Sequence, residues 1–241
     1  MAVNYLIAAW WGDRQLDNYC PKPERSTYYL EKQFEHLDAL QHSLDQITVI
    51  VPAFDEAPEE YKTFIDELPD QLGDARVEVF QRDNFGISYG GYTEACRHYR
   101  DDFDQFMLVE DDYVPVLDNF DQIFLDYLRK QDKPGYVASC VTRSGIASHS
   151  VGIVSSEAMA ASFDAHWGLV RSRARFGGIQ GRFASPFRVL GYGLTHIAGE
   201  YGVPYTDFRY WPKYRWLTRV TRPVVFSPVQ FCHEFFDPGS Q

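Results

Sequence analysis

The sequence predicts an α/β fold with a mostly parallel central sheet and helices on both faces. The main observation is that short apolar runs alternate with helical patterns over residues 1–143. The runs expected to be strands cover residues 5–11, 47–51, 77–80, 106–109 and 136–141. Each run is nearly continuous in apolar side chains, as expected of a strand buried on both faces, and enough chain separates the runs for helical crossovers. Together these observations predict strand–helix–strand units and therefore parallel pairing.

Helices are predicted between the strands, where apolar residues recur three and four positions apart. They are expected at residues 26–44, 59–68, 90–99 and 120–130. From residue 144 onwards the alternation is lost and the chain becomes rich in Gly, Arg and aromatic residues, so residues 144–241 are expected to form an irregular second half. Because no linker separates this half from residues 1–143, we expect a single domain.

The composition narrows the class of protein further. The chain has 241 residues, 45% of them hydrophobic and 24% charged, which is typical of a globular protein. Its four cysteines are scattered without a Cys-x-x-Cys pair, which argues against a disulfide scaffold and a cysteine zinc site. No apolar stretch reaches the roughly 20 residues of a membrane-spanning helix, and the apolar run after Met1 lacks the features of a signal peptide. We therefore expect a soluble, cytoplasmic protein.

The net charge of −11 is distributed unevenly along the chain. Residues 166–222 carry a charge of +8, whereas the remainder carries −19. A difference of this size indicates one face that meets an anionic ligand, with a merely solvated basic surface as the alternative.

Three consecutive acids, Glu110, Asp111 and Asp112, directly follow the apolar run at residues 106–109. In an open parallel sheet, ligands bind at the carboxyl ends of the strands, and the acidic triplet falls at such an end. Adjacent carboxylates repel one another and are stabilised by a cation, and Mn²⁺ or Mg²⁺ prefers oxygen ligands. The triplet therefore predicts a metal site, against the alternative of a solvated acidic turn before a helix.

Residues 76–115 resemble the nucleotide-binding half of GT-A glycosyltransferases, a Rossmann-like fold, and in particular the large family 2. The resemblance lies in the strand at residues 77–80, the loop Asn84-Phe85-Gly86, the small-residue helix start at residues 88–95, and the acidic triplet followed by Pro115. It implies a metal-dependent glycosyltransferase that moves a sugar from a nucleotide sugar, expected to be a UDP-sugar, to an acceptor hydroxyl. In this resemblance, residues 144–241 form the acceptor-binding half.

The resemblance also implies site roles by position. The residues expected to contact the nucleotide sugar are Trp10, Trp11, Asp55, Arg82, Asn84, Gly86, Glu110 and Asp111. The tryptophans would stack on the base and Asp55 would bind it, although core packing is the alternative for both indoles. Gly86 would let the backbone approach the diphosphate closely.

Asp112 is the expected main ligand of the Mn²⁺ or Mg²⁺ ion. His233 is the expected second ligand, because several GT-A enzymes complete their metal site with a late histidine and neutral imidazole suits Mn²⁺. A histidine packed among aromatics and hydrogen-bonded there is the alternative. The ion would stabilise the negative charge of the leaving diphosphate.

An inverting enzyme also needs a carboxylate base that takes the proton of the acceptor hydroxyl. Glu200 and Asp207 are the only acids of the basic segment, residues 166–222, and are the first candidates. Glu157, after the apolar run at residues 151–154, is the third. Each acid can instead be an ion-pair partner of neighbouring arginines.

Three alternatives remain open at this stage. The acceptor can be a glycan, a lipid-linked molecule or a modified base in DNA, since aromatic and cationic residues interleave at residues 208–222. A nucleotidyltransferase has a similar sheet and similar carboxylate–metal chemistry, but usually carries a Gly-rich basic loop after the first strand, where this chain has Ala-Trp-Trp-Gly-Asp-Arg at residues 9–14. A binding protein that has kept the fold without catalysis is the third.

Overall fold

The computed structural model describes residues 1–12, 26–84, 87–111, 113–115, 117–139, 151–164, 187, 189–197 and 231–233. The strands are β1 (Val3–Ala8), β2 (Gln46–Pro52), β3 (Gln71–Leu72), β4 (Ala75–Arg82), β5 (Gln105–Glu110), β6 (Tyr113–Pro115), β7 (Tyr136–Ala138), β8 (Val151–Ser155), β9 (Leu194–His196) and β10 (Phe231–His233). The helices are α1 (Tyr28–Ala39), α2 (Glu59–Asp66), α3 (Ile87–His98), α4 (Phe120–Arg129) and α5 (Ser156–Asp164), with a 3-10 helix η1 (Phe54–Glu56).

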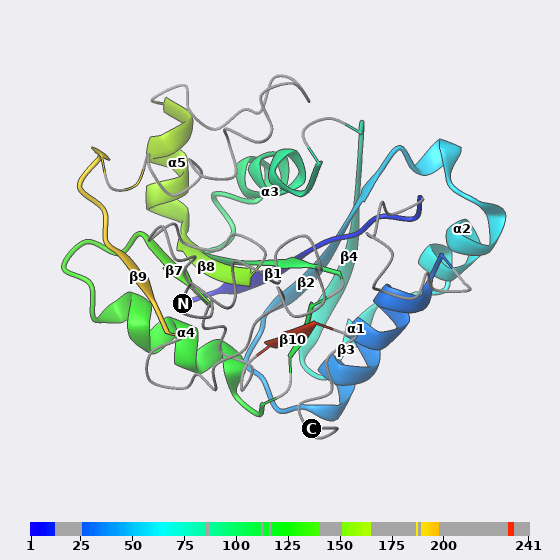
Figure 1. The fold of residues 1–241 in the computed structure, drawn as a ribbon, viewed down its shortest axis with the longest axis horizontal. Helices are drawn as coiled ribbons and strands as arrows, with labels where there is room; N and C mark the ends of the chain where they lie inside the picture. Colours follow the sequence, from blue (N-terminus) through cyan, green and yellow to red (C-terminus); the bar gives the residue numbers. More distant parts are fainter. Residues whose placement is uncertain are drawn as a thin grey trace, which may run out of the picture.

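The centre of the molecule is an eight-stranded sheet in the order β3-β4-β2-β1-β5-β8-β7-β9 (Figure 1). Strands β4, β2, β1 and β5 are parallel neighbours. Strand β8 is antiparallel to both β5 and β7, and β7 is parallel to β9. A separate small sheet pairs β10 with β6 in antiparallel fashion. The predicted α/β class with a mostly parallel sheet is confirmed.

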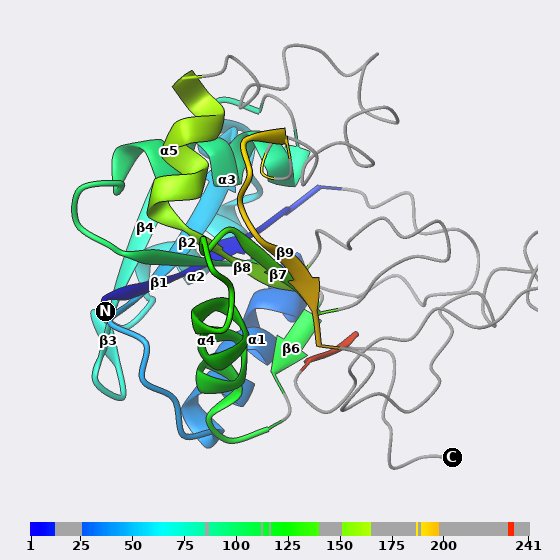
Figure 2. The ribbon, with the colours of Figure 1, turned by 90° about the vertical axis from the view of Figure 1, so that its left-hand side faces the viewer.

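Helices cover both faces of the sheet, as predicted (Figures 1 and 2). Side chains from α1, α2 and α4 form one buried cluster with alternate residues of β1, namely Val3, Tyr5 and Ile7. Leu6, from the other face of the same strand, belongs to a second cluster with side chains of α3 and α5. This alternation follows from the period of two along a strand. In the part of the chain described above, no helix is long and apolar enough to cross a membrane.

The first strand differs in its bounds from the predicted residues 5–11. It begins at Val3 and ends at Ala8, so both tryptophans lie beyond it. The early start was hidden by Asn4, a polar residue that is nonetheless fully buried. The first helix also ends at Ala39, before the predicted residue 44.

The second half of the chain contributes more regular structure than predicted. Strand β8 and helix α5 follow one another directly, and β9 extends the sheet beyond β7. The apolar run at residues 151–155 carried the signal for β8, but nothing in the run itself indicated that the strand enters the sheet antiparallel to β5.

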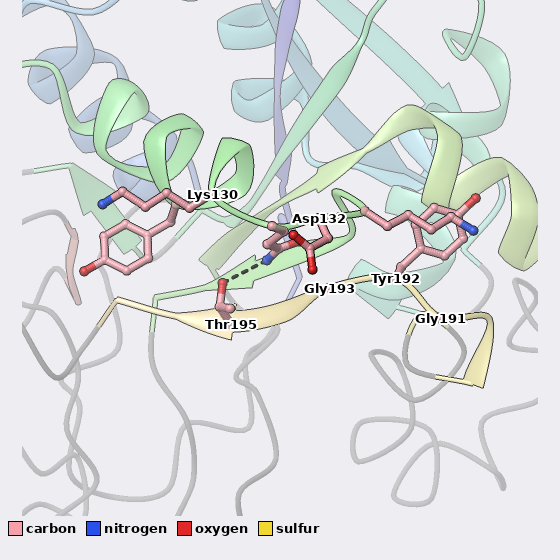
Figure 3. Close-up of a pocket in the computed structure, with 9 residues that line it drawn as sticks. Lys130, Asp132, Gly191, Tyr192, Gly193 and Thr195 are labelled. Atoms are coloured by element: carbon pink, nitrogen blue, oxygen red, sulfur yellow. Dashed lines mark hydrogen bonds between the residues drawn. The ribbon is translucent and has the colours of Figure 1, made fainter.

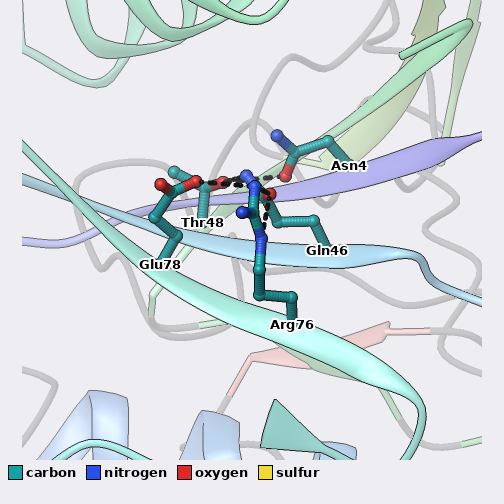
Figure 4. A network of polar contacts seen from close by, with 5 residues as sticks. All are labelled: Asn4, Gln46, Thr48, Arg76 and Glu78. Atoms are coloured by element: carbon teal, nitrogen blue, oxygen red, sulfur yellow. Dashed lines mark hydrogen bonds and ion pairs between the residues drawn. The ribbon is translucent and has the colours of Figure 1, made fainter. Parts of the chain in front are cut away.

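A polar network crosses three parallel strands on the face covered by α3 (Figure 4). The Thr48 hydroxyl donates to the Asn4 amide oxygen over 2.9 Å and accepts from Gln46 Nε2 over 2.7 Å. Arg76 Nε donates to Gln46 Oε1 over 3.1 Å, and Arg76 Nη2 lies 3.3 Å from Glu78 Oε2. Because a one-residue slip would move these polar groups into the opposite, apolar face, the network specifies the register of β1, β2 and β4.

We expect Thr48→Val to lower the free energy of unfolding by about 1–3 kcal/mol, because it deprives two buried amide groups of a partner while keeping the side-chain shape. Urea unfolding followed by far-UV circular dichroism measures the change. Thr63→Val, at an exposed position of α2, is the matched control and is expected to change stability by less than about 0.5 kcal/mol. Equal effects of the two substitutions would contradict a role for the network.

Candidate active site

The carboxyl ends of β1, β2, β4 and β5 meet at one edge of the sheet because these strands are parallel neighbours. Ala8 at the end of β1 lies beside Glu110 of β5, and Pro52 at the end of β2 lies beside Arg82 of β4. The segments after the four strands therefore gather at this edge, which is where an open α/β sheet binds its ligands. We call it the nucleotide edge, after the nucleotide that the sequence is expected to bind there.

Glu110, the last residue of β5, is held by the first turn of α3. Its Oε1 accepts a hydrogen bond from the Ser88 hydroxyl over 2.8 Å. Tyr89 and Tyr92 follow on the same helix, and burial raises the pKa of both phenols, with the charge of Glu110 as the next cause. Both phenols therefore stay protonated, and the Ser88 hydroxyl is a hydrogen-bond donor to the Glu110 carboxylate.

Asp111 is buried and joins the ends of two neighbouring strands. Its Oδ2 accepts the backbone N–H of Trp10 over 3.0 Å, and its own N–H donates to the Ala8 carbonyl over 3.2 Å. The first two acids of the triplet thus have protein donors, which stabilises their charges beside one another. Asp112, the third, lies outside the described residues.

Trp10 and Trp11 lie at the nucleotide edge, where the sequence predicts them, and stack on each other. Their ring centroids are 5.0 Å apart with an interplanar angle of 24°. Trp11 Nε1 donates to the Pro52 carbonyl over 3.0 Å, which ties the end of β1 to the end of β2. A side chain at Gly12 would place its Cβ 2.6 Å from the Trp10 ring, so the close approach requires glycine. Both indoles are only partly buried, which leaves ring surface at the edge.

The segment after β2 turns at Ala53, whose φ of 48° and ψ of 48° are unusual for a residue with a side chain. Its N–H donates to the Arg82 carbonyl over 2.8 Å, which fixes the turn. Such backbone conformations cost on the order of 1 kcal/mol and cluster at functional sites. The turn leads into η1, which carries Asp55 as an exposed side chain.

Arg82 is committed to the protein at this edge. Its side chain is 3% exposed, and its Nε and Nη2 lie 2.7 and 3.3 Å from the two carboxylate oxygens of Glu94 on α3. This ion pair holds α3 against β4, and the expected contact of Arg82 with a diphosphate stays a prediction. Asn84, two residues later, is exposed.

Together these bonds form a closed series around the nucleotide edge. Asp111 joins β5 to β1, the Trp11 indole joins β1 to β2, and Ala53 joins β2 to β4. Arg82 then joins β4 to α3 through Glu94, and Ser88 joins α3 back to β5. We call this series the hydrogen-bond ring. Ser88 and Glu94 were not among the predicted site residues. No spacing in the sequence relates Ser88 to Glu110 or Glu94 to Arg82.

The strand β10 reaches the acidic triplet from the far end of the sequence. It pairs with β6, and the backbone of His233 lies opposite Tyr113, the residue directly after Asp112. This pairing places the backbone of His233 beside the residue that follows Asp112 in the chain.

Glu157 lies at the opposite end of the sheet along the strand direction, where β5 begins. It is in the first turn of α5, which directly follows β8, and the end of β8 is paired with Gln105 at the start of β5. Its Oε1 accepts the Tyr192 hydroxyl over 3.1 Å. The structure therefore separates Glu157 from the acidic triplet by the length of β5.

The remaining predicted residues, Gly86, Glu200 and Asp207, lie outside the described residues, as does most of the basic segment. Within the described part of the chain, no group of three His, Cys, Asp or Glu side chains is arranged to hold a metal ion. The predicted metal site, with Asp112 as its main ligand, stays a prediction.

Comparisons with known proteins show the fold. No family model and no curated protein sequence matches the chain. A cytidylyltransferase from Leptospira borgpetersenii is similar in structure, with a TM-score of 0.52 and 17% identity over 82% of this chain and 76% of that chain. A 4-diphosphocytidyl-2C-methyl-D-erythritol synthase from Anaerococcus prevotii has a TM-score of 0.51 and 9% identity over 81% of this chain and 86% of that chain. The chain thus has the Rossmann-like fold of these nucleotide-binding proteins, while membership of glycosyltransferase family 2 is not supported.

Two substitutions test the role of the buried ion pair in the hydrogen-bond ring. We expect Glu94→Gln to destabilise the protein more than Arg82→Met, by about 1–3 kcal/mol. The first substitution leaves a buried guanidinium with one carboxylate fewer, whereas the second removes the buried charge and keeps an apolar stem. Urea unfolding of both variants measures the order, and a larger loss in Arg82→Met would show that Glu94 is not the main partner of the guanidinium.

Proposed function

We propose that the protein is a transferase that binds a nucleotide-activated substrate at the nucleotide edge, and that it transfers a sugar from a nucleotide sugar, expected to be a UDP-sugar. The pairing of β10 with β6 carries this proposal. It brings the backbone of His233 next to that of Tyr113, the residue after Asp112, which supports the proposal that the late histidine and the third acid act together on the diphosphate. The stacked tryptophans at the neighbouring strand ends suit the flat face of a base.

In this proposal the roles divide along the edge. Trp10, Trp11 and Asp55 bind the base, and the Asn84–Gly86 loop lies along the ribose and diphosphate. Glu110, oriented by the Ser88 hydroxyl, accepts a ribose hydroxyl, because an ionised carboxylate is a hydrogen-bond acceptor at both oxygens. Asp111 fixes the position of the Trp10 backbone by accepting its N–H.

Asp112 and His233 would hold Mn²⁺ or Mg²⁺, a cation that supplies electrostatic stabilisation to the leaving diphosphate. The acceptor hydroxyl attacks the anomeric carbon, the bond to the diphosphate oxygen breaks, and a carboxylate takes the hydroxyl proton. Glu200 and Asp207 remain the proposed bases. Glu157 is the weaker candidate because it lies at the opposite edge of the sheet.

The acceptor is proposed to bind along the basic segment, residues 166–222. Its charge of +8 suits an acceptor that carries negative charge, such as a phosphorylated glycan, a lipid-linked diphosphate or a modified base in DNA. Arginine side chains would fork onto phosphate oxygens in any of these.

Nucleotidyl transfer is the second candidate, and the similar structures favour it over glycosyl transfer, because both are nucleotidyltransferases. Its reaction joins a nucleoside monophosphate to a phosphorylated substrate and releases pyrophosphate. The segment after β1 counts against it. Where such enzymes usually carry a Gly-rich basic loop, Trp10 and Trp11 fill the first positions with stacked rings, and the Trp10 N–H is engaged by Asp111.

Two assays separate the candidates. We expect nucleoside diphosphate release from a panel of UDP-, GDP- and CMP-linked sugars with Mn²⁺ (nucleoside monophosphate for the CMP-sugars), and no pyrophosphate release from CTP or UTP with sugar 1-phosphates. Pyrophosphate release without hydrolysis of any nucleotide sugar would replace the first candidate with the second.

We expect Asp112→Ala to lower nucleotide-sugar hydrolysis by about 10²–10³-fold at saturating Mn²⁺, because charge stabilisation of the leaving group is lost. Asp101→Ala is the matched control, since Asp101 is exposed and lies before β5, away from the nucleotide edge. Unchanged hydrolysis in Asp112→Ala would refute the metal role.

A further inference from the structure

A cavity of about 390 Å³ opens at the edge of the sheet opposite the nucleotide edge (Figure 3). It lies between the end of α4, the loop that precedes β7, and the segment that leads into β9. Because β7 runs parallel to β5, its start and the start of β9 are at the far end of the sheet from Glu110. The volume falls within the range of roughly 300–1,000 Å³ in which small-molecule sites are found.

The floor of this cavity is built from fixed groups. Gln131 Nε2 donates to the Thr195 hydroxyl over 2.9 Å and to the Tyr136 carbonyl over 3.2 Å, while its Oε1 accepts the Gly135 N–H over 2.8 Å. Three hydrogen bonds hold this one amide in a single orientation. The Thr195 hydroxyl is thereby set as an acceptor toward Gln131 and keeps its own proton for another partner.

Glycines bring the main chain to the border of the cavity. A Cβ at Gly193 would lie 2.3 Å from Gln131 Oε1, so no side chain fits between this strand and the floor. Gly191 has a φ of +79°, which glycine adopts without strain, and nothing lies within 4 Å of where its Cβ would be. The turn before β9 therefore exposes backbone and leaves open space beside it.

The two ends of the cavity each carry a lysine over a tyrosine ring. Lys130 Nζ lies 4.9 Å from the Tyr127 ring centroid, and Lys133 Nζ lies 3.7 Å from that of Tyr192. Figure 3 shows Lys130 and Tyr192 at opposite ends, with Asp132 between them. Cation–π contacts restrict both ammonium groups, which lowers the entropy lost when they donate to a ligand.

The lining of this cavity carries charges of both signs. Lys130 and Lys133 lie on it together with Asp132, while Glu157, outside the lining, accepts the Tyr192 hydroxyl. A plain anion would meet the Asp132 carboxylate, and a plain cation both lysines. A molecule with many hydroxyl groups pairs with all of them, since each hydroxyl donates to a carboxylate and accepts from an ammonium.

We propose that this cavity is a saccharide-binding site separate from the nucleotide edge. Sugar hydroxyls would pair with Lys133, Asp132 and the Thr195 hydroxyl, and the C–H face of a sugar ring would pack near the tyrosines. The proposal stands whether the protein transfers glycosyl or nucleotidyl groups, because none of the lining residues belongs to the proposed reaction. Glu157, the weakest base candidate, lies outside the lining.

Ligand-observed saturation-transfer NMR on the full chain tests the site with maltose and chitobiose as probes, and phosphorus NMR line broadening tests inorganic phosphate. We expect saturable binding of at least one disaccharide below about 10 mM, and none of phosphate in that range. Lys133→Met is expected to raise the Kd of the bound disaccharide about tenfold. Asp132→Asn, an isosteric change at an exposed position, is expected to raise it several-fold. Lys62→Met, on α2 at the other end of the sheet, is the matched control and leaves Kd unchanged.

The Asp112→Ala variant separates this site from the nucleotide edge. Its Kd for the disaccharide is expected to equal that of the unmodified chain. The proposal is overturned if neither disaccharide binds, if phosphate binds as tightly as the sugars, or if Asp132→Asn and Lys133→Met leave Kd unchanged. Loss of binding in Asp112→Ala also overturns it, because the sugar would then occupy the donor site.

Discussion

The hydrogen bond from the Trp10 N–H to Asp111 is the interaction on which the nucleotide edge depends. It lies at the centre of the sheet, where β1 and β5 end side by side, and it uses the first backbone donor past Ala9. A buried carboxylate needs such a donor, and a strand that has lost its pairing partner needs an acceptor. This contact fixes the backbone just past the first strand and stabilises the second acid of the triplet. The indole of the next residue, Trp11, then bonds to Pro52 at the end of β2.

The remaining contacts of the hydrogen-bond ring extend this constraint outward. The contacts between β1 and β2 and between β2 and β4 connect elements that are not consecutive in the chain, and two more tie α3 to the strands before and after it. The ring therefore resists the separation of any one strand end from its neighbours. The left-handed turn at Ala53 fits this arrangement, because a strained conformation persists only where surrounding bonds determine it. Preorganisation of this kind lowers the cost of ordering a substrate at the edge.

The sequence predicted the parts of the fold that local patterns encode. Strands β2 and β5 were located well because their apolar runs are continuous, and the acidic triplet was placed at a strand end for the same reason. The bounds of β1 were wrong because Asn4 breaks the apolar pattern, and its burial depends on Thr48 from another strand. No local pattern indicates such a partner.

The same limit applies to the candidate site. The positions of Trp10, Trp11, Glu110 and Asp111 after strands were predicted from the apolar runs, whereas the ion pair of Arg82 with Glu94 was not anticipated. The balance between ligand and protein contacts depends on how α3 packs, which residue types and spacing do not encode. The antiparallel entry of β8 likewise decides where Glu157 lies, and the direction of a strand is not visible in its composition.

The pairing of β10 with β6 has a consequence for the order in which the molecule is completed. Every strand of the eight-stranded sheet lies before residue 197, whereas β10 begins at Phe231. During synthesis on the ribosome, the large sheet can therefore assemble while the strand beside the acidic triplet has not yet emerged. A chain that stops before Phe231 would contain every strand of the eight-stranded sheet but would lack the strand that pairs with β6.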